Sequence, residues 1–279
     1  MKTLLRSFTK RIKNFLILSF TLILSYFLMV PEVSCNNLFN SKINSLNKAD
    51  IFVMGHVYET NNETDDGISQ NLLNFLNSQR IDDKTVGIFS GDLVRSPNEI
   101  SLMNAKLQIE KYFKTYFNAI GNHDKHESYS NIFGETFFSL ETNNFLILGA
   151  DFNTNNWLPI NSDKNLINYI ISKTTKKNIL LISHPIFWLE AVDYAVQPNN
   201  IPDKVIPVED PFEWIELGNK NLIVISGDSG KWGQKFYYEE VSRNITVISN
   251  GLGGYSNDSI IKIMEDENRF TFERVKINN

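Results

Sequence analysis

The stretch Tyr116–Asp124, with the sequence YFNAIGNHD, decides how the rest of the chain is interpreted. It begins with a short apolar run, typical of a buried strand, and ends in a polar tetrapeptide. Polar residues directly after a buried strand lie at the carboxyl edge of a sheet, where α/β proteins build their sites. Because Gly and Asn also favour ordinary turns, the tetrapeptide needs support from other parts of the chain.

Three other apolar runs end in the same way. His56 follows the run IFV, Asp92 follows VGIFSG, and His184 follows ILLIS. The chain has only four histidines, and three of them stand just past a strand-like run: His56, His123 and His184. We expect these imidazoles and the carboxylate to meet at one edge of the fold, in a pattern typical of metal ligands.

The order His56, Asp92, Asn122-His123, His184 resembles the calcineurin-like metallophosphoesterase superfamily. The resemblance covers about residues 50–275. It implies two divalent metals that clamp a phosphoryl group and polarise a water molecule. It also implies that Asp92 bridges the metals and that Asn122, His184 and His56 are further ligands.

The same resemblance implies a catalytic pair. His123 matches the proton donor to the leaving group, and Asp124 is placed to orient it through a carboxylate–imidazole hydrogen bond. An ordinary turn is the competing interpretation of this tetrapeptide. The other motifs, in the same order along the chain, favour the catalytic interpretation.

Two motifs depart from the superfamily pattern. Met54 stands where the first motif has Asp, and a thioether does not replace a hard anionic ligand. In the last motif, Asp228 and Gly230 stand where two histidines are expected. Asp228 is interpreted either as a metal ligand or as a turn residue.

Both departures remove ligands from one metal site, and the other site keeps a full set. The depleted site retains His56 and Asp92, and the other retains Asp92, Asn122 and His184, with Asp228 able to fill the fourth place. We therefore expect one intact site for a divalent metal (Mn, Mg, Fe or Zn) rather than two. Among the acidic residues that follow His56, Glu59, Asp65 and Asp66 could supply oxygens to the depleted site.

The hydrophobic pattern predicts a mixed α/β fold. Strands are expected at 51–54, 85–90, 116–120, 137–140, 145–148, 178–183 and 221–226, and helices at 68–76, 99–113 and 165–172. Four further strands, at about 235–240, 244–249, 259–264 and 269–275, are expected to be antiparallel. Two packed sheets follow from this order, and the superfamily resemblance implies the same fold, a four-layer αββα sandwich of two mixed β-sheets.

The N-terminus predicts export. A Lys- and Arg-rich start precedes Phe15–Val30, which carries no charge. Residues 1–35 are interpreted as a signal peptide or a retained membrane anchor, residues 36–49 as a linker, and residues 50–279 as the metallophosphoesterase-like domain. Both alternatives place the domain outside the cytoplasmic membrane, whether periplasmic, extracellular or anchored facing outward. An uncleaved segment makes the membrane a partner.

Composition narrows the classes of function. The net charge of −5 gives no basic surface, so nucleic acid is not an expected partner. A single cysteine excludes an intramolecular disulfide. The sequence thus predicts an exported, metal-dependent hydrolase of a phosphorylated substrate, either a phosphomonoester or a phosphodiester. The alternative is a non-catalytic protein that binds a metal or phospholigand, with a possible place in cell-envelope or surface-polymer assembly.

Overall fold

The structure, a computed structural model, describes residues 50–58, 67–153, 158–186, 212–228, 237–242, 244–253, 258–266 and 269–277. The chain divides into two compact units, Met1–Ile43 and Asn44–Asn279, and all of the described residues belong to the second. The predicted signal or anchor and the linker lie outside the described residues. No helix within the described ranges has the length and apolar character needed to cross a membrane.

One sheet has five strands in the order β11-β10-β1-β2-β3. Its parallel part consists of β1 (Asp50–Met54), β2 (Val86–Ser90) and β3 (Thr115–Ala119). On the other side of β1, β10 (Ser259–Glu265) and β11 (Phe270–Lys276) continue the sheet as antiparallel strands. The parallel strands all end at the same edge, which is where the polar motifs follow.

The second sheet has six strands in the order β4-β5-β6-β7-β9-β8. Four central strands are parallel: β5 (Phe145–Gly149), β6 (Asn178–Ser183), β7 (Asn221–Ser226) and β9 (Ile245–Ser249). The edge strands β4 (Phe138–Glu141) and β8 (Tyr237–Ser242) are antiparallel to their neighbours. The expected antiparallel pairing of the last four strands is found in β8–β9 and β10–β11, whereas β9 also pairs in parallel with β7 because it lies between β7 and β8.

The two sheets pack face to face around an apolar core. In β1, Ile51 and Val53 point into this core, which side chains such as Ile147 and Ile182 of the second sheet complete. Phe52 and Met54 point the other way, into a cluster formed with the helices. This alternation follows from the period of two along a strand.

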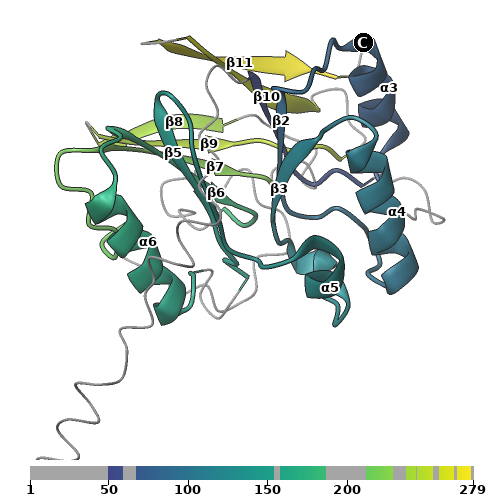
Figure 1. Ribbon diagram of the computed structural model, residues 1–279, viewed down its shortest axis with the longest axis horizontal. Helices are drawn as coiled ribbons and strands as arrows, with labels where there is room; N and C mark the ends of the chain where they lie inside the picture. The colour runs from purple at the N-terminus through teal and green to yellow at the C-terminus, as the bar shows by residue number, and fades with distance from the viewer. Residues whose placement is uncertain are drawn as a thin grey trace, which may run out of the picture. The chain divides into compact units, whose positions relative to one another are not determined.

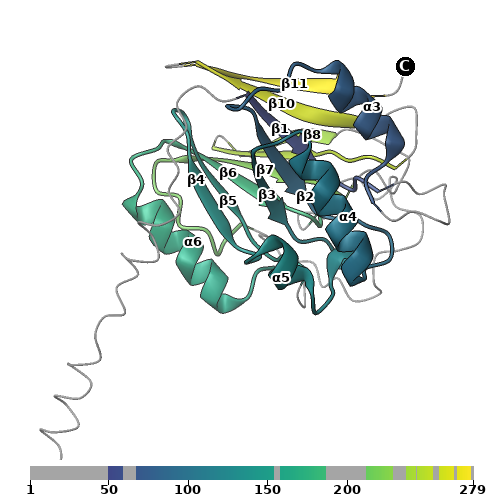
Figure 2. The same ribbon diagram turned by 45° about the vertical axis from the view of Figure 1, so that its right-hand side comes forward.

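Helices cover the outer faces of the sheets (Figures 1 and 2). Helices α3 (Gln70–Ser78) and α4 (Glu99–Glu110) lie beside the first sheet, and α6 (Asn161–Lys173) lies on the far side of the second. The predicted four-layer αββα sandwich is confirmed. The resemblance to the calcineurin-like metallophosphoesterases is thus one of motif order and of layer architecture.

Helix boundaries differ from the predicted ones by up to four residues. Helix α6 begins at Asn161, four residues earlier than predicted, because its first turn carries no apolar residue. The short helix α5 (Tyr129–Phe133) was not predicted, since five residues are too few for a helical period to show. By contrast, α4 begins where predicted, after a capping box in which Asn98 and Ser101 bond each other's backbone N–H groups.

Candidate metal centre

The predicted ligands converge where strands of both sheets end. His56 and Asp92 each lie two residues past the ends of β1 and β2, and Asn122 opens a 3₁₀ turn shortly after β3. His184 directly follows β6, and Asp228 lies two residues past β7. The carboxyl ends of parallel strands therefore bring together side chains that are up to 172 positions apart in the sequence (Asp228 minus His56).

His184 lies at the centre of one half of this cluster. Its Nε2 atom is 2.9 Å from Oδ1 of Asn122, 3.2 Å from Oδ1 of Asp92 and 3.7 Å from Oδ1 of Asp228. These four residues are the set expected for the intact metal site, and the structure places all of them together.

His56 completes the other half. Its Nε2 atom lies 3.8 Å from Oδ2 of Asp92. His56, Asp92 and Asp228 each offer a ligand atom, and the three atoms lie within 4.8 Å of one another. Asp92 faces both halves, one carboxylate oxygen toward each histidine, as expected for a bridging carboxylate.

Both histidines are held through their Nδ1 atoms. Nδ1 of His56 donates to the carbonyl of Leu252 at 2.6 Å, and Nδ1 of His184 donates to the carbonyl of Ser90 at 3.0 Å. Because a carbonyl only accepts, each Nδ1 carries a proton, and each ring turns its Nε2 atom into the cluster. Metal-binding histidines are commonly fixed in this way.

The charges of the cluster are strongly coupled. Burial alone would raise the pKa of Asp92, but His184 and His56 lower it to about 2. Burial would lower the pKa of His184, but Asp92 and Asp228 raise it to about 10. Without a metal, a proton on Nε2 of His184 therefore supplies the positive charge that the surrounding oxygen atoms require.

His56 has no such proton. Burial lowers its pKa to about 4, although Asp92 acts in the opposite direction. Nε2 of His56 and Oδ2 of Asp92 are both buried without a hydrogen-bond partner among the described residues. Two acceptors cannot satisfy each other, whereas one cation between them satisfies both. The donor set of two imidazoles, two carboxylates and an amide oxygen fits a divalent metal.

The backbone at this edge is unusual. His56 and Asp92 have φ values of 49° and 58°, in the left-handed region that residues with a side chain rarely adopt. Gly91, at φ 83°, packs so closely that a Cβ atom would come within 2.5 Å of the His184 ring. Such conformations concentrate at functional sites, where the surrounding structure enforces them.

Asp124 has a different task from the predicted one. Its carboxylate accepts backbone N–H groups from Asp92 at 2.8 Å, Leu93 at 2.7 Å, Val94 at 3.3 Å and Gly121 at 2.9 Å. It is fully buried, and both of its oxygens are occupied by this loop. The prediction that Asp124 orients the His123 ring is wrong, because Asp124 shapes the turn that carries Asp92 instead.

His123 is oriented by another group. Its Nδ1 atom donates to the carbonyl of Arg95 at 2.8 Å, and its backbone N–H donates to Oδ1 of Asp92 at 3.0 Å. The residue is half-buried, and because Nδ1 is engaged, Nε2 is the nitrogen that remains to exchange a proton. The sequence could not show this arrangement, because the orienting group is a main-chain carbonyl.

Met54 is part of an apolar cluster. Its side chain is fully buried in the apolar cluster between the first sheet and its helices, with Phe89 and Leu93. It provides packing at the position where the superfamily has a ligand. The other residues discussed for the depleted site lie outside the described residues; they are Glu59, Asp65, Asp66 and Gly230.

Tyr58 is a site residue that sequence reasoning missed. Its ring lies 4.4 Å from that of His56 and 5.4 Å from that of His123, measured between centroids. The only available signal was its position two residues after His56, next to a strand end. Aromatic residues are common at such positions for packing alone, so the signal did not distinguish it.

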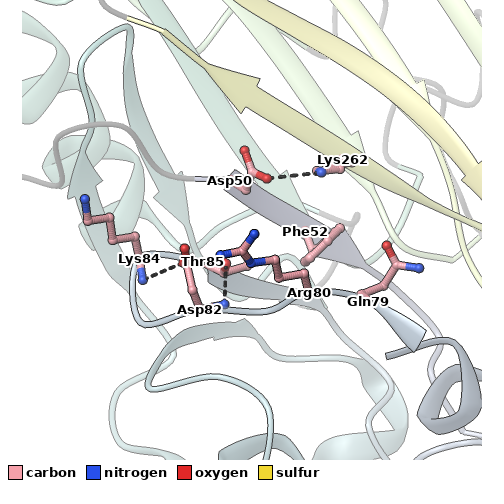
Figure 3. Close-up of a pocket in the computed structure, with 8 residues that line it drawn as sticks. All are labelled: Asp50, Phe52, Gln79, Arg80, Asp82, Lys84, Thr85 and Lys262. Atoms are coloured by element: carbon pink, nitrogen blue, oxygen red, sulfur yellow. Dashed lines mark hydrogen bonds and ion pairs between the residues drawn. The ribbon is translucent and has the colours of Figure 1, made fainter. Parts of the chain in front are cut away.

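A separate cavity of about 470 Å³ lies at the opposite end of β1 (Figure 3). Asp50 there pairs with Lys262 at 3.1 Å, and Asp82 accepts the backbone N–H of Lys84 and the hydroxyl of Thr85. Its wall mixes both signs of charge and holds neither a histidine nor any of the predicted ligands. The chemistry therefore centres on the carboxyl ends of the strands.

Comparison with known proteins gave matches only in structure. No family model and no curated protein matches the chain. Vps29 from Entamoeba histolytica, complexed with Zn²⁺, is similar with 12% identity and a TM-score of 0.36, over 82% of this chain and 99% of that one. Vps29 from Cryptosporidium parvum has 10% identity and a TM-score of 0.37, over 83% and 99%.

A third similar structure is a serine/threonine phosphatase from Saccharomyces cerevisiae, described as similar to human PP5. It has 11% identity and a TM-score of 0.36, over 86% of each chain. The assignment of the metal centre rests on the side chains of this chain and not on these likenesses.

Proposed function

We propose that the domain is a metal-dependent phosphoester hydrolase acting on a phosphomonoester or phosphodiester. The observation that carries this proposal is the pair of buried acceptors, Nε2 of His56 and Oδ2 of Asp92, beside the His184 cluster. A bound divalent metal supplies positive charge for the phosphoryl oxygens and lowers the pKa of a bound water molecule.

The residues of the chain divide this work. Asp92, Asn122, His184 and Asp228 would hold the metal, and His56 would contribute from the opposite side of Asp92. His123 would donate a proton from Nε2 to the leaving alkoxide, since its Nδ1 is engaged by Arg95. The bond from the His123 backbone to Asp92 keeps proton donor and metal ligands in fixed relation.

Export is part of the same proposal. The positive, then uncharged, N-terminal residues support a domain that acts outside the cytoplasmic membrane, attached to it if the segment is retained. A reporter fused after Asn279 tests this directly. Activity of a reporter that functions only in the cytoplasm would contradict export.

A second candidate is a non-catalytic protein that holds a phosphorylated ligand through one metal. The burial of Met54 among apolar side chains favours it, because the position cannot supply a second carboxylate to the depleted site. Both candidates need the metal, and only the hydrolase needs His123 as a proton donor.

The deciding experiment is a phosphoester screen with the purified chain loaded with Mn²⁺, Mg²⁺ or Zn²⁺. If the chain is a hydrolase, His123→Ala keeps the metal and lowers turnover by about 10²–10⁴-fold for alkyl esters, with a smaller loss for nitrophenyl esters. Asp92→Asn serves as the metal-deficient control and should be inactive on both. A wild-type chain that binds metal and phosphate but hydrolyses no ester would establish the binding protein instead.

A further inference from the structure

The Tyr58 ring packs against the rings of both His56 and His123. Its ring is tilted by 41° against His56 at a centroid distance of 4.4 Å, and by 55° against His123 at 5.4 Å. Only 4% of the residue is exposed. Distances of this kind are those of packed aromatic pairs, so the ring is a wall shared by a candidate ligand and the candidate proton donor.

The backbone around Tyr58 is pinned on both sides. Val57 donates to the carbonyl of Asp92 at 2.9 Å, and the carbonyl of Val57 accepts from Ser69 at 2.8 Å. Tyr58 itself pairs with Ile68 in an antiparallel bridge. Because these contacts fix the main chain, the Tyr58 ring is a rigid surface rather than a mobile one.

The His123 ring needs such a surface. Among the described residues, the ring makes one hydrogen bond, from Nδ1 to the carbonyl of Arg95, and this contact fixes a single atom of the ring. A flat neighbour at 5.4 Å limits rotation of the ring about this contact and determines where Nε2 points.

We propose that the ring of Tyr58 is a positioning element for His123, aiming its Nε2 atom at the leaving group. The proposal rests on the proposed function in so far as His123 acts as a proton donor. It assigns the effect to the aromatic ring and not to the hydroxyl group.

Two substitutions separate ring from hydroxyl. In the metal-loaded chain, Tyr58→Phe should keep kcat within about 2-fold, whereas Tyr58→Leu should lower kcat for an alkyl phosphate by about 10-fold with little change in KM. For a nitrophenyl phosphate, which needs no proton, Tyr58→Leu should have little effect. In a His123→Ala background, Tyr58→Leu should cause no further loss, because the two residues act as one unit.

Packing loss and metal loss are controlled separately. Phe113→Leu removes a buried aromatic ring from the apolar cluster and should not change the ratio of alkyl to nitrophenyl rates. Tyr58→Met keeps a similar volume without a ring, and replaces Tyr58→Leu if that variant does not fold. Metal content should be equal in all Tyr58 variants; a variant that loses the metal would place the effect at His56 and overturn the proposal.

A spectroscopic measurement tests the positioning without turnover. Loss of the Tyr58 ring current shifts the His123 Hε1 resonance by itself, so the readout is the line width, which should increase in Tyr58→Leu or Tyr58→Met and stay close to wild type in Tyr58→Phe. An unchanged His123 line width in the ring-less variants would overturn the proposal. If the wild-type chain hydrolyses nothing, the proposed function fails, while the resonance still decides whether Tyr58 positions His123.

Discussion

Nε2 of His56 faces Oδ2 of Asp92 at 3.8 Å, and neither atom has a hydrogen-bond partner among the described residues. Both residues are almost completely buried. An unpaired acceptor in a protein interior costs about 1–3 kcal/mol, and here two of them point at each other. The arrangement is unfavourable alone and becomes favourable when a cation lies between the two atoms.

Adding a divalent metal should therefore stabilise the folded chain. At a free metal concentration of 100 times Kd, the free energy of unfolding should rise by about 2.7 kcal/mol. Asp92→Asn should remove this gain, whereas Asp83→Asn, in an exposed pair with Lys114, should leave it unchanged. Thermal unfolding and elemental analysis check both points. We expect close to one tightly bound ion per chain, and two would contradict the single intact site.

The combined contribution of His56 and His184 to the stability of the metal-free chain should be greatest near pH 6.5. The pKa of His56 in the fold, about 4, lies below its ordinary value of 6.5, so stability falls as the pH drops from 6.5 toward 4. The pKa of His184 is raised to about 10, so its contribution is complete below 6.5 and is lost as the pH rises toward 10.

Urea unfolding in EDTA across pH 5–9 measures this profile. His184→Gln should flatten the alkaline limb, and His56→Gln the acidic one. A metal-free stability that keeps rising above pH 7 would show that the His184 proton is not held by Asp92 and Asp228.

Asp124→Asn should destabilise the fold rather than alter the proton donor. Both carboxylate oxygens of Asp124 accept hydrogen bonds from backbone N–H groups. In asparagine one of these oxygens is replaced by an NH₂ group, which cannot accept, so the turn that carries Asp92 loses contacts. We expect a loss of about 3 kcal/mol in the free energy of unfolding. Asp83→Asn is again the matched surface control, with a change of about 0.5 kcal/mol or less. A stable Asp124→Asn variant with altered leaving-group dependence would instead support the orienting role predicted from sequence.

Met54→Asp should fail to rebuild a second metal position. The side chain points into the apolar cluster, so a carboxylate there would be buried without a partner, at a cost of about 3–5 kcal/mol. Met54→Leu keeps the volume and should cost less than about 1.5 kcal/mol. A Met54→Asp variant that is as stable as Met54→Leu and gains a second ion would refute this account of the depleted site.

The strands and the ligand positions could be predicted from sequence because both depend on local patterns. Apolar runs such as the one before His184 show as strands by composition alone, and polar residues after parallel strands must share an edge. The proximity of His56 and Asp92 follows from these two facts, whereas His184 reaches them from the other sheet, through the packing of the two sheets. The pairing of β9 with β7 did not follow, since strand order depends on long-range packing.

The roles of side chains were less predictable than their positions. Asp124 bonds only to backbone N–H groups, and Arg95 orients His123 through its carbonyl, so neither role depends on a residue type that a motif would display. Tyr58 contributes through the shape of its ring. Such contacts are set by the path of the main chain, which sequence motifs do not specify.

The left-handed backbone of His56 and Asp92 has a consequence for the resistance of the protein to proteolysis when divalent ions are scarce. Each such conformation costs roughly 1–3 kcal/mol, a large fraction of the 5–15 kcal/mol that keeps a typical domain folded. Asp92→Gly would relieve part of that cost, so this variant should be more stable than Asp92→Ala, although both lack the ligand. With the native residues, the stability of the folded chain depends on a bound metal ion. Chelation should therefore accelerate proteolysis of the wild-type chain more than proteolysis of Asp92→Gly.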